Sequence, residues 1–277
     1  MRLTLADGCT PCQPRAIKGS GNGVEPELFV TMIQRRLRMP IFAVEHFCPF
    51  CDDVVDTYGD HCVVCCGGGD RIKRHNLLRN QAYQHCLDAG LSAELERPGL
   101  LRPRPLVGGV EENGARFDGP HNPAGRRPAD VYVPRWRGGT PACLDFAVTS
   151  GLRADKLRAS ALDGSVAASH YEGFKCGYLG TKDLCQAEGM AFIPMIVEAV
   201  GGGWGSEAAK VWAELAKTIA LATGEPRAII SSRLLQSLAI RLHRENARAI
   251  LRRSPRALDP AFVSSASAVL AGEVDAA

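Results

Sequence analysis

Residues 127–149, RPADVYVPRWRGGTPACLDFAVT, form the stretch that decides the fold. Residues 130–134 and 142–149 are short apolar runs typical of strands, and a turn with two adjacent glycines joins them. Asp130 begins the first run, and Asp145 lies inside the second, where burying an unpaired carboxylate is costly. The stretch therefore predicts two neighbouring strands that each carry an aspartate.

Two carboxylates on neighbouring strands indicate a cation site. Fourteen residues separate Asp130 from Asp145, about the length of a hairpin. Oxygen ligands of this kind suit Mg²⁺ or Mn²⁺, and such an ion can activate water against a phosphodiester. The alternative is a purely structural pair that is hydrogen-bonded to Arg126, Arg127 or local amides, and the spacing alone leaves it open.

Outside this stretch, helical and strand patterns alternate along the chain. Residues 98–128 are rich in Gly, Pro and Arg and predict a long loop. The other predicted elements are helices over 25–38, 72–89 and 165–188, a mostly helical remainder from about residue 206, and strands over 93–96 and 191–197. This order indicates an α/β or mixed α+β fold.

The cysteines point to a second metal. The chain has 11 cysteines and no apolar export signal at its start, which argues against a disulfide framework and for an intracellular protein. Cys48, Cys51, His61 and Cys65 have the spacing C-x2-C-x9-H-x3-C, which suits tetrahedral, structural Zn²⁺. Cys66 could replace Cys65 by a shift of one residue, and buried free thiols are the alternative to any metal.

The basic residues are mostly arginines. Net charge is only +3, although 26 of the 33 basic residues are Arg. Residues from about 228 to 253 predict a helix, and residues 227–253 hold seven Arg against one acid, Glu245. The candidates for contact with a nucleic-acid backbone are Arg241, Arg244, Arg248 and Arg252. The alternative is an ordinary solvated face, or a protein-interaction module if other helices cover it.

The order of several motifs resembles one known family. A Cys-Cys-His-Cys knuckle containing Tyr58-Gly59-Asp60-His61 precedes residues 67–76, GGGDRIKRHN, and then come R-P-A-D at 127–130 and L-D-F-A-V at 144–148. Residues 192–198, FIPMIVE, followed by glycines, also fit. Together these pieces resemble the restriction-like endonuclease region that follows the reverse transcriptase in site-specific non-LTR retrotransposons.

The resemblance implies a PD-(D/E)XK-type fold, a mixed central sheet flanked by helices, with Asp130 and Asp145 as the metal-binding acids. Ala147 stands where the wider superfamily has a lysine, and the retroelement branch takes a lysine from the following helix instead. Lys175 fits that place best, and its role would be to orient water or stabilise phosphate charge. The open alternatives are Lys182 and Lys156 for the lysine, an ordinary solvated Lys175, and His75, Asn76 and Glu96 as further site residues.

The implied organisation has four parts. These are an N-terminal extension and helix (1–46), a zinc knuckle (47–70), a restriction-endonuclease-like core (71–205) and a C-terminal helical region (206–277). We expect a metal-dependent DNA endonuclease of retroelement origin that acts in the nucleus, is neither secreted nor in a membrane, and binds DNA. RNA of the element and, in a longer polyprotein, the reverse transcriptase are further partners to consider. The rival is a zinc-stabilised nucleic-acid-binding protein that has lost catalysis.

Overall fold

The computed structural model describes residues 23–102, 127–153 and 155–255. Its helices are α1 (Pro26–Arg36), α2 (Asp60–Val64), α3 (Asp70–Asp88), α4 (Leu157–Leu162), α5 (Val166–Gly177), α6 (Thr181–Ala187), α7 (Ser206–Thr223) and α8 (Arg227–Leu251). Its strands are β1 (His46–Phe47), β2 (Val54–Val55), β3 (Glu94–Leu95), β4 (Val131–Val133), β5 (Ala142–Thr149) and β6 (Ala191–Glu198). The outer parts of the predicted terminal regions and most of the predicted loop lie outside the described residues.

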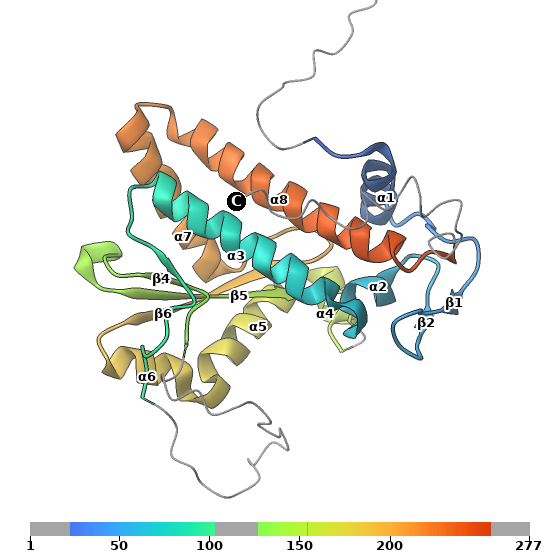
Figure 1. The fold of residues 1–277 in the computed structure, drawn as a ribbon, viewed down its shortest axis with the longest axis horizontal. Coiled ribbons are helices and arrows are strands. Elements are labelled where there is room, and N and C mark those ends of the chain that lie inside the picture. The colour runs from blue at the N-terminus through green and yellow to red at the C-terminus, as the bar shows by residue number, and fades with distance from the viewer. Residues whose placement is uncertain (1–22, 103–126, 154, 256–277) are drawn as a thin grey trace, which may run out of the picture.

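A four-stranded sheet in the order β3-β4-β5-β6 forms the centre of the molecule (Figure 1). The strands β3, β4 and β5 are antiparallel, whereas β5 and β6 are parallel, so the sheet is mixed. The predicted hairpin is confirmed, with Val131 opposite Leu144. Because parallel strands need a crossover, the chain between β5 and β6 runs through α4, α5 and α6.

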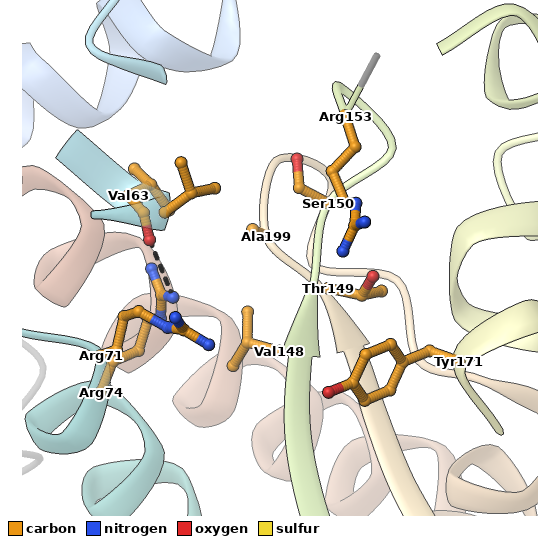
Figure 2. A pocket seen from close by; sticks show the side chains of 10 residues that line it. Val63, Arg71, Arg74, Val148, Thr149, Ser150, Arg153, Tyr171 and Ala199 are labelled. Atoms are coloured by element: carbon orange, nitrogen blue, oxygen red, sulfur yellow. Dashed lines mark hydrogen bonds between the residues drawn. The ribbon is translucent and has the colours of Figure 1, made fainter. Parts of the chain in front are cut away.

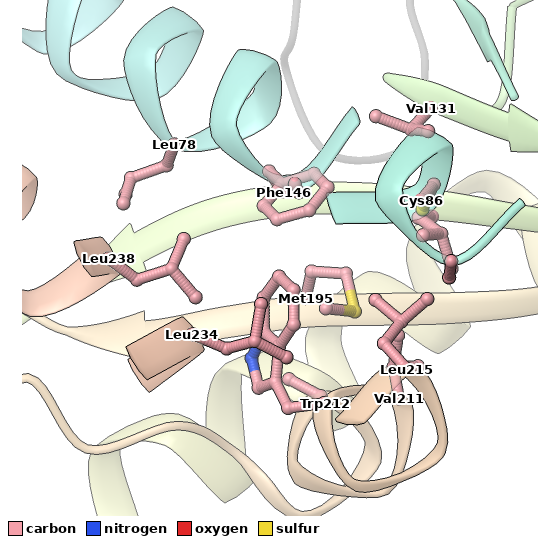
Figure 3. Packing of buried hydrophobic residues seen from close by; sticks show 14 of the residues in the cluster. Leu78, Cys86, Val131, Phe146, Met195, Val211, Trp212, Leu215, Leu234 and Leu238 are labelled. Carbon is pink, nitrogen blue, oxygen red and sulfur yellow. The ribbon is translucent and has the colours of Figure 1, made fainter. Parts of the chain in front are cut away.

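Helices cover both faces of the sheet. Figure 1 shows α3, α7 and α8 on one side and α5 and α6 on the other. The main core lies between the sheet and the first group, where Leu234 and Leu238 of α8 meet Trp212 of α7 and Phe146 of β5 (Figure 3). Leucines at positions 234, 238 and 242 lie four residues apart, so they form one apolar stripe on α8 that packs into this core.

The helix predicted over residues 165–188 is interrupted, so that prediction is wrong in one respect. A short 3-10 turn at Tyr178–Gly180 separates α5 from α6. Leu179 and Gly180 have φ values of 55° and 61°, which an α-helix cannot contain. Lys182 therefore lies on α6 and does not share a helix with Lys175.

The predicted α/β class is confirmed as a mixed four-stranded sheet flanked by helices. The two C-terminal helices are part of its main core and not an appendage, because buried residues of α7 and α8 belong to the same cluster as α3 and the sheet. Among the described helices, none combines the length and apolar character that a membrane crossing requires.

Candidate metal centre and candidate active site

Four potential zinc ligands gather beside α2. Donor atoms of Cys48, Cys51, His61 and Cys65 all lie within 4.8 Å of one another. Cys51 Sγ is 3.3 Å from His61 Nε2 and 3.5 Å from Cys65 Sγ, and Cys48 Sγ is 3.9 Å from Cys65 Sγ. In a tetrahedral zinc site, ligand atoms are separated by about 3.6–3.8 Å. The donor set therefore fits a structural Zn²⁺ ion.

Backbone hydrogen bonds hold His61 in place within this cluster. The Asp56 carboxylate accepts hydrogen bonds from the backbone N–H groups of Tyr58, Asp60 and His61 at 2.8–3.1 Å. Burial opposes the charged form of Asp56, but these donors stabilise it and lower the pKa of Asp56. Gly59 adopts a left-handed φ of 70°, which lets the chain turn into α2 and point His61 toward the cysteines.

The structure places Cys65, and not Cys66, in the cluster. Cys66 is exposed, and its Sγ accepts a hydrogen bond from Arg71 Nη1 at 3.0 Å. The nearby Cys62 is buried outside the cluster, and burial raises its pKa to about 12. By contrast, although burial favours the Cys65 thiol, hydrogen bonds from Arg253 and the Gly67 N–H lower its pKa. A lowered pKa favours the thiolate that zinc requires.

The two predicted acids lie close enough for the charge of Asp130 to act on Asp145. Val131, the first residue of β4, pairs with Leu144, and the N–H of the preceding Asp130 donates to the Leu144 carbonyl at 2.9 Å, which holds Asp130 beside this part of β5. Both side chains are about one-fifth exposed. The local sequence thus places two acids near each other, one just before β4 and one within β5, the two middle strands of the sheet.

Each acid also has a cationic or proton-bearing partner from a helix. Lys175 Nζ on α5 lies 2.7 Å from Asp145 Oδ2, and His75 Nε2 on α3 lies 3.1 Å from Asp130 Oδ2. The Phe146 N–H donates to the same Asp130 oxygen at 2.6 Å. Residues from α3, β5 and α5, together with the residue that precedes β4, therefore converge on one spot.

The charges at this spot affect one another. Burial raises the pKa of Asp145; Lys175 opposes this rise, and the charge of Asp130 adds to it. The Asp130 carboxylate raises the pKa of His75. Burial alone would lower the pKa of Lys175, but the Asp145 carboxylate outweighs it and the pKa is raised. Two acids that disfavour each other's charge are the kind of pair that a divalent cation stabilises.

The other site candidates lie elsewhere. Glu96 pairs with Arg79 and with Arg127, so Arg127 is directed to Glu96 and not to the aspartates. Lys182 is exposed on α6, and Lys156 lies 3.8 Å from Asp155. Asn76 Oδ1 is 3.2 Å from His75 Nδ1 and fixes that ring. Arg126 lies outside the described residues.

Sequence reasoning left His75 as an ambiguous residue. It follows Arg74 near the start of α3, and nothing in the local pattern distinguishes a site residue there from a helix start. Only the packing of α3 against β4 and β5 brings its ring to Asp130. The segment RHN was the available signal, because it is one of the motifs of the resemblance.

The four candidate arginines of α8 do not form an open basic face. Neighbouring helices α1, α3 and α7 pack against α8, and these arginines are only partly exposed. Three of them have carboxylate partners within the chain, in the pairs Arg244–Glu25, Arg248–Glu245 and Arg252–Asp70. Arg241 is half-buried, and burial lowers its pKa. Backbone binding by these four residues stays a prediction that these contacts do not favour.

Comparison with known proteins gives no assignment. No protein-family model matches the chain, and no curated protein is significantly similar to it. The chemistry must therefore be argued from the site itself.

Proposed function

We propose that this chain is a metal-dependent DNA endonuclease module of retroelement origin, with a restriction-endonuclease-like core, that hydrolyses a phosphodiester. The observation that carries the proposal is the convergence of Asp145 of β5, Lys175 of α5 and His75 of α3 with Asp130, which directly precedes β4. A mixed sheet flanked by helices and a Cys-Cys-His-Cys cluster support the resemblance that first indicated this family.

Asp130 and Asp145 would hold the Mg²⁺ or Mn²⁺ ion. The donor set fits, because two carboxylates on adjacent strands supply hard oxygen ligands and their mutual repulsion would be relieved by a cation. When bound, such an ion supplies an activated water and neutralises charge on the phosphate. Its site is separate in chemistry from the zinc cluster, whose donors are three sulfurs and one nitrogen.

The chain's own residues prepare the site for a phosphate. The Lys175 ammonium lies beside Asp145, where it can stabilise negative charge that develops on phosphate oxygens. The His75 ring holds the Asp130 carboxylate through Nε2, and Asn76 holds the ring through Nδ1. These contacts fix the acids before substrate arrives, so little reorganisation is needed.

The zinc cluster is proposed to be structural. Cys48, Cys51, His61 and Cys65 fill four positions with protein ligands, which leaves no open position for a catalytic water. The knuckle packs against the end of α8 through a shared apolar cluster that includes Cys48, Cys62 and Ile250. Zinc would therefore stabilise a segment that borders the active-site helix α3.

DNA in the nucleus is the proposed substrate, with RNA of the element and a linked reverse transcriptase as further partners. A rival function, nucleic-acid binding without catalysis, is favoured by one observation: Ala147 stands on β5 where the wider superfamily has its lysine. The internal ion pairs of α8 favour a third class, a protein-interaction module. These ion pairs argue against α8 as a DNA contact, but they do not involve the aspartate pair.

Plasmid nicking separates these functions. We expect the zinc-loaded protein to convert supercoiled plasmid to the open circle with Mg²⁺ and not without it, and Asp145→Ala to abolish this. Salt-sensitive DNA binding by wild type with no nicking would establish the rival. If the protein neither binds nor nicks DNA, the protein-interaction module is the function that remains.

A further inference from the structure

A cleft lies beside the proposed active site, and the proposed mechanism does not use it. It has a volume of about 340 Å³ and opens between α2, the start of α3 and the end of β5 (Figure 2). Its polar lining consists of Arg71, Arg74, Thr149, Ser150, Arg153 and Tyr171. None of the described side chains that line it is a carboxylate.

Arg74 places a buried positive charge in one wall. Only 6% of this residue is exposed, and its hydrogen bonds go to neutral groups, Asn246 Oδ1 at 2.7 Å and the Val63 carbonyl at 3.1 Å. Its buried Nε has no partner among the described residues. Burial, followed by the charges of Arg71 and Arg35, lowers the pKa of Arg74 to about 10, so the guanidinium stays charged at neutral pH. The Asp70 and Glu245 carboxylates favour this charge from a distance, but their ion pairs go to other arginines, so a bound anion would further stabilise the buried guanidinium.

Two further arginines stand on opposite sides of the cleft. Figure 2 shows Arg71 extending from α3 and Arg153 from the chain that follows β5. Arg71 Nη1 donates a hydrogen bond to the Cys66 sulfur and not to a carboxylate. Arg153 pairs with Asp155 at 3.0 Å, but both side chains are more than half exposed, so this pair is weak and exchangeable. The cleft therefore keeps an excess of positive charge.

Hydroxyl groups complete the lining with further hydrogen-bond donors. Ser150 is 7% exposed, and its Oγ accepts the Leu152 N–H at 3.2 Å, which leaves its hydroxyl proton able to donate. In Figure 2 the Tyr171 ring lies across the cleft from the α3 arginines, beside the end of β5. Guanidinium groups and hydroxyls together match the oxygens of a phosphate.

The cleft continues three of the elements that build the proposed active site. Arg71 lies one turn before His75 on α3, Tyr171 one turn before Lys175 on α5, and Thr149 follows Asp145 on β5. Four residues span about 6 Å along a helix and about 13 Å along a strand. Because each nucleotide of a strand rises about 3.4 Å, the cleft and the proposed active site are separated by roughly two to four nucleotides.

We propose that the cleft binds a backbone phosphodiester of the same nucleic-acid strand, a few nucleotides from the one that is cut. The identity of this ligand as nucleic acid rests on the proposed function. Arg74 supplies a fixed charge, Arg71 and Arg153 close on the phosphate oxygens, and no base is read. The contact positions the strand and is independent of sequence.

The test measures DNA binding without cleavage. Full-length Arg71→Gln and Arg153→Gln proteins, in the Asp145→Asn background and without Mg²⁺, are titrated against a fluorescein-labelled duplex between 50 and 200 mM salt. We expect each variant to bind roughly tenfold more weakly. Each should also reduce, by about 1, the magnitude of the negative slope of the logarithm of the DNA-binding constant against the logarithm of the salt concentration. Arg135→Gln removes the same charge at the opposite end of β5 and should change neither quantity.

Two controls keep the outcome decisive. Zinc content and thermal unfolding show whether Arg71→Gln disturbs the knuckle, and if it does, Arg153→Gln carries the result. In a separate arm, inorganic phosphate alone is tested for stabilising wild type. DNA binding by Arg71→Gln and Arg153→Gln equal to that of Arg135→Gln would overturn the proposal. Stabilisation by phosphate with no effect of the variants on DNA binding would assign the cleft to a small anion. Because no cleavage is measured, an inactive nuclease would not affect the conclusion.

Discussion

Arg253 illustrates how this protein compensates its buried charges. The side chain is fully buried, and Nη1 lies 2.6 Å from Asp70 Oδ2 while Nη2 donates to the Gly67 carbonyl at 2.8 Å. Glu172, which is also buried, accepts the Glu207 N–H at 3.0 Å at the start of α7, where a carboxylate is favourable. By contrast, the hydrogen bonds of Arg74 to described residues all go to neutral groups, which distinguishes this wall of the cleft from the other buried charges.

A partly buried histidine predicts part of the pH dependence of stability. Burial, followed by the charges of Arg36 and Arg35, lowers the pKa of His243 below the ordinary histidine value of about 6.5. Below pH 6.5 the unfolded chain therefore binds more protons at this position than the folded chain does, so stability falls as pH falls. Urea unfolding at pH 7.5 and 5.5 should show a loss in wild type that is smaller in His243→Gln. For one proton the difference is at most about 1.4 kcal/mol per pH unit. Equal losses in the two proteins would refute this role.

Among the elements, α8 connects the parts of the fold. Its leucine stripe enters the main core, while Ile250 near its end belongs to the apolar cluster of the knuckle. Just beyond its end, Arg252 and Arg253 both pair with Asp70 and lie over the ring of Phe50. The Cys-Cys-His-Cys cluster is thus attached to the core by α8.

The stripe on α8 can be tested by two substitutions of the same kind. Leu238 is 1% exposed and Leu235 is 38% exposed. We expect Leu238→Ala to lower the free energy of unfolding by about 2–5 kcal/mol because it leaves a cavity, and Leu235→Ala by about 0.5 kcal/mol or less. Denaturant unfolding measures both. Similar, small losses would mean that α8 is not part of the core.

The knuckle can be tested by its metal content. Purified protein should carry about one Zn²⁺ per chain, and Cys51→Ser should lose it, because one of the four ligands is removed. The matched control is Cys66→Ser, which changes an exposed cysteine outside the cluster and should retain the metal. Elemental analysis with unfolding curves measures the result. A wild-type protein without zinc, or zinc loss in Cys66→Ser alone, would contradict the assignment.

For the molecule as a whole, the sequence predicts features that depend on nearby residues better than features that depend on contacts between distant residues. The hairpin of β4 and β5 follows from adjacent strand signals, and the zinc ligands follow from spacing within 18 residues. The break at Leu179 was missed because a left-handed non-glycine residue has no clear sequence signal. The pairing of Arg244 with Glu25, 219 positions apart, was missed because a helical pattern shows which residues share a face and not what covers it.

The proposed site shows the same limit. Asp130 and Asp145 were predicted from the sequence because a hairpin brings them together. Lys175 required the resemblance, and the structure brings its ammonium to Asp145. His75 and the arginines of the cleft depend on how α3 packs against β4 and β5, which no local pattern encodes.

The central claim, a metal-dependent nuclease centre at the aspartate pair, is tested most directly by comparing nicking rates of three zinc-loaded proteins with Mg²⁺. Wild type should nick supercoiled plasmid, and Asp145→Asn should be slower by on the order of 100-fold or more, because a ligand for the cation and a partner of Lys175 is lost. Asp183→Asn, on exposed α6, should match wild type. Nicking by Asp145→Asn at the wild-type rate, or by wild type equally well without Mg²⁺, would contradict the account.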